Sequence, residues 1–146
     1  MEQKICLHRI TYLMHNHSST IPDLAKDIDL SIPTVTKFVM ELVEEGYIMN
    51  YGKQETSEGR PPNLYGLNPD SAYMVGVDIK ASCLNIGLMN FTGDMVDVQM
   101  GVECRLYNTL ESLEELTLHI RNFIDKHETV KERILQVGVN ISGRVN

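Results

Sequence analysis

Apolar residues between positions 30 and 48 recur at the spacing of an amphipathic helix. In the stretch LSIPTVTKFVMELVEEGYI they are close to an i, i+3, i+4, i+7, i+8 pattern, at Val35, Phe38, Val39, Leu42 and Val43. This pattern predicts a helix with one buried face. Ser31 can cap its start, Pro33 suits its first turn, and Gly46 is expected to end it.

A shorter helix is predicted immediately before this one. Thr20 can cap it, Pro22 fits its first turn, and Asp23 lies near the positive helix end. Ala25 is small enough for a helix crossing, and Asp29 tolerates the left-handed backbone of the turn. Two capped helices around a turn of about three or four residues are typical of a helix-turn-helix. The apolar contacts between the helices are expected from Leu24, Ile28, Leu30, Val35 and Phe38.

Short β-prone runs follow the two helices. Residues 47–52 and 63–68 are such runs, and the polar stretch KQETSEGRPP separates them. They predict a two-stranded hairpin with a long polar tip, which turns the unit into a winged helix-turn-helix. A mostly helical apolar run over residues 5–14 precedes the capped helices.

The pattern of apolar and polar residues changes after Leu67, where the turn-forming residues Asn-Pro-Asp-Ser interrupt it. We therefore expect one domain over residues 1–68, with the wing and a linker, and a second over residues 69–146. In the second domain the apolar runs predict three strands, a helix and a fourth strand, over residues 75–79, 84–91, 95–102, 108–127 and 135–141.

The helix of the second domain is expected to start at Asn108, three residues before Glu111, as a capping pattern. Its inward stripe is expected to comprise Leu110, Leu113, Leu116, Ile120, Phe123 and Ile124. The last strand carries apolar residues on one side, at Leu135, Val137, Val139 and Ile141. They predict an apolar edge that favours association with another chain.

Composition narrows the function. The 146 residues include 20 acidic and 13 basic side chains, a net charge of −7. Such a chain is no general binder of nucleic acid or anionic membranes, although a local DNA-reading face is compatible with it. Cys6, Cys83 and Cys104 lie far apart, which predicts free thiols and no metal site. No segment resembles a signal peptide or a membrane span, so we expect a cytoplasmic protein without a membrane partner.

The front of the second predicted helix carries groups that suit DNA. With Val35 and Phe38 inward, the outside retains hydroxyls, one positive charge and free N–H groups, with no acid before Glu41. The candidate DNA-binding residues are Thr20, Ser31, Ile32, Pro33, Thr34, Thr36, Lys37, Lys53 and Arg60. In the hairpin tip, glycine and proline hold Arg60 in an extended segment that suits a narrow minor groove. The alternatives are an ordinary amphipathic surface helix and a solvated linker.

Three stretches resemble the repressor branch of the ROK family, the repressors, open reading frames and sugar kinases. They are residues 30–48, GRPPNLYGLNPDSAYMVGVDIK at 59–80, and ILQVGVNISGRVN at 134–146. The resemblance implies an α+β chain: a winged helix-turn-helix, then the first βββαβ elements of an actin-like, RNase H-like α/β domain, truncated here. The family's sugar-contacting and catalytic segments, and its Cys/His zinc site, are expected beyond Asn146.

The resemblance implies a sequence-specific transcriptional regulator, a repressor of sugar metabolism, and no enzyme. The expected partners are a double-stranded DNA operator, a second copy of the chain, and a sugar or sugar-phosphate inducer if the rest of the domain exists. No catalytic residue, cofactor or metal is expected. Family kinases hold ATP phosphates with an Asp-x-Gly-x-Thr turn, whereas the turn from Asp78 to Ser82 has Lys80 at the glycine position. A sugar kinase with an appended head and a truncated interaction module are the alternatives.

Overall fold

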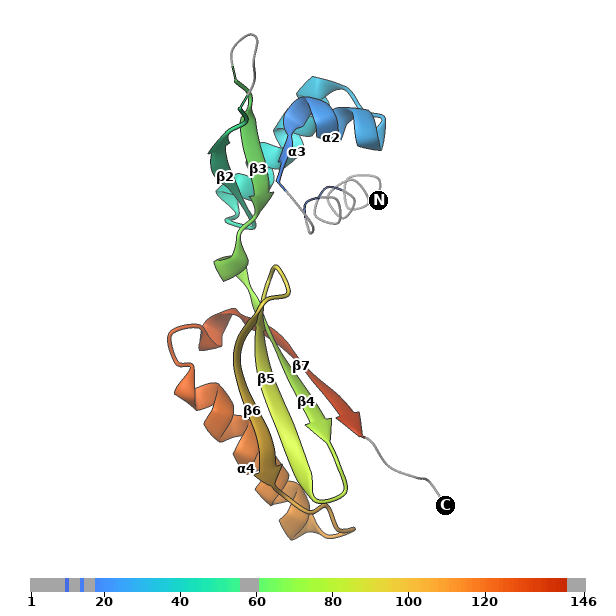
Figure 1. Cartoon of the computed structure of the whole chain (residues 1–146), viewed down its shortest axis with the longest axis vertical. Coiled ribbons are helices and arrows are strands. Elements are labelled where there is room, and N and C mark those ends of the chain that lie inside the picture. Colours follow the sequence, from blue (N-terminus) through green and yellow to red (C-terminus); the bar gives the residue numbers. More distant parts are fainter. Residues whose placement is uncertain (1–9, 11–13, 15–17, 56–60, 142–146) are drawn as a thin grey trace. The chain divides into compact units, whose positions relative to one another are not determined.

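The computed structural model describes residues 10, 14, 18–55 and 61–141. The chain divides into two compact units, Met1–Ser71 and Ala72–Asn146, each with its own sheet (Figure 1). Of the predicted helical run over residues 5–14, only Ile10 and Met14 are described, and both are buried. The other residues of that run lie outside the described part of the chain.

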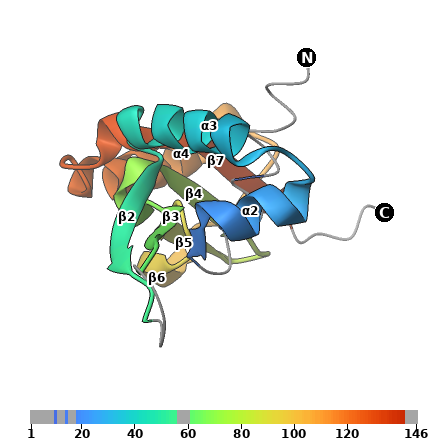
Figure 2. The same cartoon turned by 90° about the horizontal axis from the view of Figure 1, so that it is seen from above.

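The first unit combines two helices with a three-stranded antiparallel sheet. Its elements are β1 (Ser19–Thr20), α2 (Ile21–Ile28), α3 (Ile32–Glu44), β2 (Ile48–Lys53) and β3 (Asn63–Leu67). The strand order is β1-β3-β2, and Figure 2 shows α2 and α3 crossing at an angle. The predicted helices and hairpin are confirmed. The sequence did not predict β1, because two residues are too few to show a periodic pattern.

Left-handed backbone ends both helices. Asp29 has φ 56° and ψ 48°, and the N–H of Leu30 donates to the carbonyl of Ala25 at 3.0 Å. Gly46 has φ 81°, and the N–H groups of Gly46 and Tyr47 donate to carbonyls in the last turn of α3, at 3.0 and 2.9 Å. These two hydrogen bonds satisfy carbonyl groups at the end of α3 that have no donor within the helix. The expected roles of Asp29 and Gly46 are confirmed.

The core of the first unit lies between the helices and the sheet. Its buried apolar residues are Ile10, Met14, Leu24, Ala25, Ile28, Val35, Val39, Leu42, Ile48, Tyr65 and Leu67. Ala25 is 5% exposed, as expected of a small residue at a helix crossing. Of the five predicted interhelical contacts, Leu30 and Phe38 are only half-buried.

The second unit is a four-stranded sheet with one helix on its face. Its elements are β4 (Tyr73–Ile79), β5 (Cys83–Asn90), β6 (Met95–Glu103), α4 (Leu110–Lys126) and β7 (Ile134–Ile141). The strand order is β6-β5-β4-β7, in which β7 runs parallel to β4 and the other pairs are antiparallel. The predicted order of three strands, a helix and a fourth strand is confirmed.

Two short 3-10 helices, Pro69–Ser71 and Lys131–Arg133, precede β4 and β7.

The core of the second unit lies between the sheet and α4, because alternate residues of β4 and β5 face this helix. The buried cluster consists of Tyr73, Val75, Val77, Ile79, Leu84, Ile86, Leu88, Cys104, Leu116 and Phe123.

The start of α4 differs from the prediction. Thr109, and not Asn108, caps the helix, because its hydroxyl accepts the N–H of Ser112 at 3.4 Å. Leu110 and Leu113 are 67% and 53% exposed, so the expected inward stripe is wrong at these two positions. Each helical residue is rotated by about 100° from the last, and the face toward the sheet is centred on Ser112 and the later residues Leu116 and Phe123.

One charged contact ties the end of α4 to β6. Asp97 on β6 accepts a hydrogen bond from Lys126 Nζ at 2.8 Å, and its carboxylate lies 3.1 Å from His127 Nε2. The hydrogen bond from Lys126 holds the pKa of Asp97 below its ordinary value. A lowered pKa in the folded state means that ionised Asp97 stabilises the fold.

We expect Asp97→Asn to lower the stability of the second unit at neutral pH. The difference from the original chain should shrink as the pH falls below about 4, where the carboxyl protonates in the unfolded and then in the folded state. Urea unfolding by circular dichroism at several pH values measures this. The control is Glu103→Gln, an exposed acid on the same strand. A pH-independent loss would show that the charge of Asp97 is irrelevant.

Candidate nucleic-acid interface

The start of α3 is held by a tight network of hydroxyls. The Ser31 hydroxyl accepts the N–H of Thr34 at 3.3 Å and lies 2.7 Å from the Thr34 hydroxyl. Pro33 in the first turn leaves no N–H to satisfy there. The first turn contains no acid. The positive end of the helix is therefore capped but not neutralised, which favours an anion.

Six predicted interface residues follow one another along this first part of α3. Ser31, Ile32, Pro33 and Lys37 are exposed, whereas Thr34 and Thr36 are half-buried. The Lys37 side chain is 72% exposed. These residues are accessible to a macromolecule, and their contacts with DNA stay a prediction.

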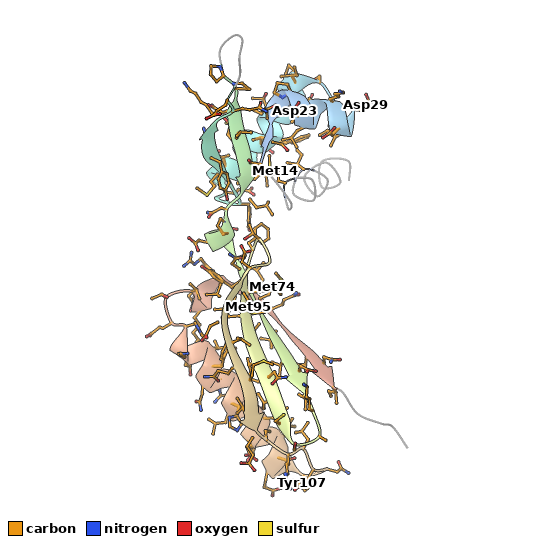
Figure 3. All side chains as sticks on the ribbon, in the orientation of Figure 1. Met14, Asp23, Asp29, Met74, Met95 and Tyr107 are labelled. Atoms are coloured by element: carbon orange, nitrogen blue, oxygen red, sulfur yellow. The ribbon has the colours of Figure 1, made fainter. Side chains whose placement is uncertain are left out.

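Thr20 is placed differently from the other candidates. It is 2% exposed, its hydroxyl donates to Asp23 Oδ2 at 2.6 Å, and it also accepts the N–H of Asp23. Figure 3 labels Asp23, in the first turn of α2. The Thr20 side chain therefore serves the capping box of α2, and we leave it out of the proposed interface.

Lys37 has an acidic neighbour in Glu41, the first acid that the sequence places after the front of the helix. Its Nζ lies 3.9 Å from Glu41 Oε1, one turn further along α3. Such an exposed pair contributes little energy and is screened by salt. The i, i+4 spacing of Lys37 and Glu41 in the sequence was the signal that could have predicted this ion pair.

The described part of the wing includes one of its two predicted cations. Lys53 is the last residue of β2 and is exposed, and the N–H of Gln54 donates to the carbonyl of Pro62 at 2.9 Å. This bond extends the pairing of the hairpin beyond the strands. Arg60 lies outside the described residues.

A hollow of about 270 Å³ joins the helices to the wing. Its walls are Ile21, Pro22, Ile32, Thr36, Pro62, Asn63 and Tyr65. Sequence reasoning missed Ile21, Asn63 and Tyr65 as interface candidates. No sequence signal links them, because the start of α2 and the start of β3 come together only in the tertiary structure.

The predicted turn after β4 is occupied by internal contacts. Asp78 accepts a hydrogen bond from Asn140 Nδ2 on β7 at 2.8 Å, and Lys80 Nζ lies 4.0 Å from its carboxylate. The N–H of Lys80 donates to the carbonyl of Cys83 at 2.8 Å and closes the turn. Among the described residues, no three His, Cys, Asp or Glu side chains gather in an arrangement suited to a metal ion. The described part of this turn acts as a link between neighbouring strands.

Comparisons with known proteins extend over both units. Residues 10–49 match a family model described as winged helix-turn-helix DNA-binding. The xylose repressor of Caldicellulosiruptor bescii is 27% identical over 121 residues, which cover 82% of this chain and 30% of the relative. A putative xylose repressor of Caldicellulosiruptor sp. is 26% identical over 123 residues, which cover 84% of this chain and 31% of the relative.

A crystal structure described as a ROK family transcriptional regulator, a homolog of the E. coli MLC protein, superposes with a TM-score of 0.73. It is 21% identical, and the match covers 99% of this chain and 37% of that one. The predicted resemblance to the ROK repressors is confirmed at the level of the fold, and the curated relatives are named xylose repressors. The α+β fold is that of the corresponding part of the ROK regulator, a winged helix-turn-helix followed by the first elements of its next domain.

The chain spans about a third of the ROK regulator and of the curated repressors that it matches. In the described ranges, no helix is both long and apolar enough to cross a membrane.

Proposed function

We propose that this chain is the DNA-binding part of a ROK-type transcriptional repressor of sugar metabolism. The observation that carries the proposal is the start of α3, which is capped and free of acid in its first turn and exposes Ser31, Ile32, Pro33 and Lys37. A helix N-terminus of this kind offers N–H groups and hydroxyls to phosphates and base edges. The match of residues 10–49 to a winged helix-turn-helix DNA-binding family supports the same conclusion.

We infer the class of small-molecule inducer from the names of the relatives. Both curated relatives are named xylose repressors, so the proposed inducer is a sugar or sugar phosphate, with xylose the first to test. Its binding is expected to need more of the ROK domain than the residues present here. Release of operator DNA on addition of xylose, measured with a chain that includes the whole domain, tests this part.

Lys37→Ala is expected to weaken DNA binding and to reduce its salt dependence. Lys37 is the one basic residue of α3, and the loss of one phosphate contact makes the slope of log affinity against log salt shallower by about one unit. Fluorescence anisotropy with DNA selected from a random double-stranded pool measures the slope.

The control for this experiment is Arg105→Ala, which removes an exposed charge from the second unit. It should leave affinity and slope unchanged. An unchanged slope in a folded Lys37→Ala variant would remove Lys37 from the phosphate contacts.

We propose no enzymatic activity for the chain. The curated relatives are named repressors, and Lys80 stands where kinases of the family have the glycine that lets the backbone approach phosphate. A coupled assay of ATP consumption over a panel of sugars tests this. Turnover above background would restore the sugar kinase alternative.

A second candidate function, an interaction module, rests on β7. Leu135, Val137, Val139 and Ile141 are 66%, 42%, 52% and 67% exposed on this edge strand. The edge strand offers backbone groups and apolar side chains to another strand. We therefore infer that the chain forms a homo-oligomer, alongside its binding to DNA.

A further inference from the structure

The side chains of α3 include few of the groups that most often read base edges by paired hydrogen bonds. Arginine and lysine supply bidentate contacts to guanine, and asparagine and glutamine supply them to adenine. The sequence of α3, IPTVTKFVMELVE, contains one lysine and no arginine, asparagine or glutamine. Lys37 is its one cation, and it stands next to Glu41.

The hydroxyl groups of α3 are already engaged within the helix. The Thr36 hydroxyl donates to the carbonyl of Ile32 at 2.7 Å, and the hydroxyls of Ser31 and Thr34 lie 2.7 Å apart. The bond back to Ile32 uses the one hydroxyl proton of Thr36. The Thr36 hydroxyl can then only accept a hydrogen bond from a partner, and its methyl group is available for apolar contact.

Three residues of α3, Ile32, Thr36 and Met40, form a ridge, called here the apolar ridge. These residues are spaced four apart, so they follow one another along one side of the helix. Ile32 is 52% exposed and Met40 is 39% exposed. Ile32 and Thr36 also form part of the wall of the hollow beside the wing.

We propose that the apolar ridge recognises thymine through its C5-methyl groups in the major groove. This methyl is the one apolar group among the base-specific features of that groove, and aliphatic side chains contact it. Burying Ile32 and Met40 against thymine methyls removes apolar surface of both partners from water. The inference rests on the proposed function and specifies which bases α3 reads.

The test compares thymine with deoxyuridine, which differs by the C5-methyl alone. The full chain selects binding sites from a random double-stranded pool, and the enriched site is synthesised with thymine or with deoxyuridine at each of its thymines in turn. Loss of a buried methyl contact is expected to weaken binding about fourfold, at about 0.8 kcal/mol per group. The effect should be confined to the few thymines under the ridge.

Variants connect the effect to the ridge. Ile32→Ala should abolish the difference between thymine and deoxyuridine at one position, and Met40→Ala should do so at another. Ile32→Val keeps a branched side chain and should retain most of the difference. Leu118→Ala, at a 55% exposed position of α4, should change nothing.

The possible outcomes separate the inference from the proposed function. If the pool yields no bound DNA, the proposed function fails and the inference fails with it. If DNA is bound but deoxyuridine binds as well as thymine at every position, DNA binding stands and the inference is overturned. Sensitivity to deoxyuridine that persists in both alanine variants also overturns it, since other residues would then contact the methyl groups.

Discussion

Phe123→Ala is expected to lower the free energy of unfolding of the second unit by about 3–5 kcal/mol. Phe123 on α4 is 2% exposed and belongs to the cluster between the helix and the sheet. Its ring also lies 4.9 Å from the His127 ring. Alanine would remove this apolar area and leave a cavity that the sheet can only partly close.

Leu118→Ala is the matched control for this substitution. Leu118 is on the same helix but is 55% exposed, so its loss should change the stability by less than about 0.5 kcal/mol. Hydrogen exchange of the β5 amides, read by mass spectrometry, reports on the second unit alone. Equal effects of the two substitutions would mean that α4 does not pack on the sheet through Phe123.

The second prediction with a large expected effect concerns the oligomeric state of the chain in solution. The 146-residue chain is expected to self-associate through β7, so light scattering should give a mass above the 16.6 kDa of one chain. Antiparallel pairing of two β7 edges would satisfy backbone groups and bury exposed apolar side chains. A fragment of residues 1–68 should stay monomeric at the same concentration and remain folded.

A double substitution, Leu135→Lys with Ile141→Lys, should return the full chain to a monomer. Both positions are exposed, at 66% and 67%, so lysine fits without disturbing the sheet, and charges on an edge strand oppose pairing. Leu118→Lys on α4 is the control and should leave the mass unchanged. A monomeric original chain that unfolds cooperatively would contradict the prediction.

Interactions between near neighbours in the chain were predictable. The caps at Thr20 and Ser31, the left-handed turn at Asp29 and the end of α3 at Gly46 each depend on residues within about four positions. The start of α4 shows where such reasoning becomes ambiguous. Asn108 and Thr109 are both good caps, and the sequence pattern favoured the wrong one of the two.

The order of strands and helices along the chain was also predictable from the apolar runs. Short connections then place sequential strands next to one another in the sheet. The parallel pairing of β7 with β4, which joins residues far apart in the chain, was decided by the tertiary structure. The individual roles of the predicted DNA-binding residues stay predictions.

The sequence by itself thus determined the caps of α2 and α3, the helix-turn-helix and the order of strands and helix in the second unit. Only the tertiary structure decided that Leu113 is exposed, that Thr20 is buried and that Ile32 meets Asn63 across a hollow. It also decided that Asp97 binds Lys126, which is 29 residues away. The physical reason is that hydrogen bonds within a turn are set by local backbone geometry, whereas burial depends on which distant segment packs against a side chain.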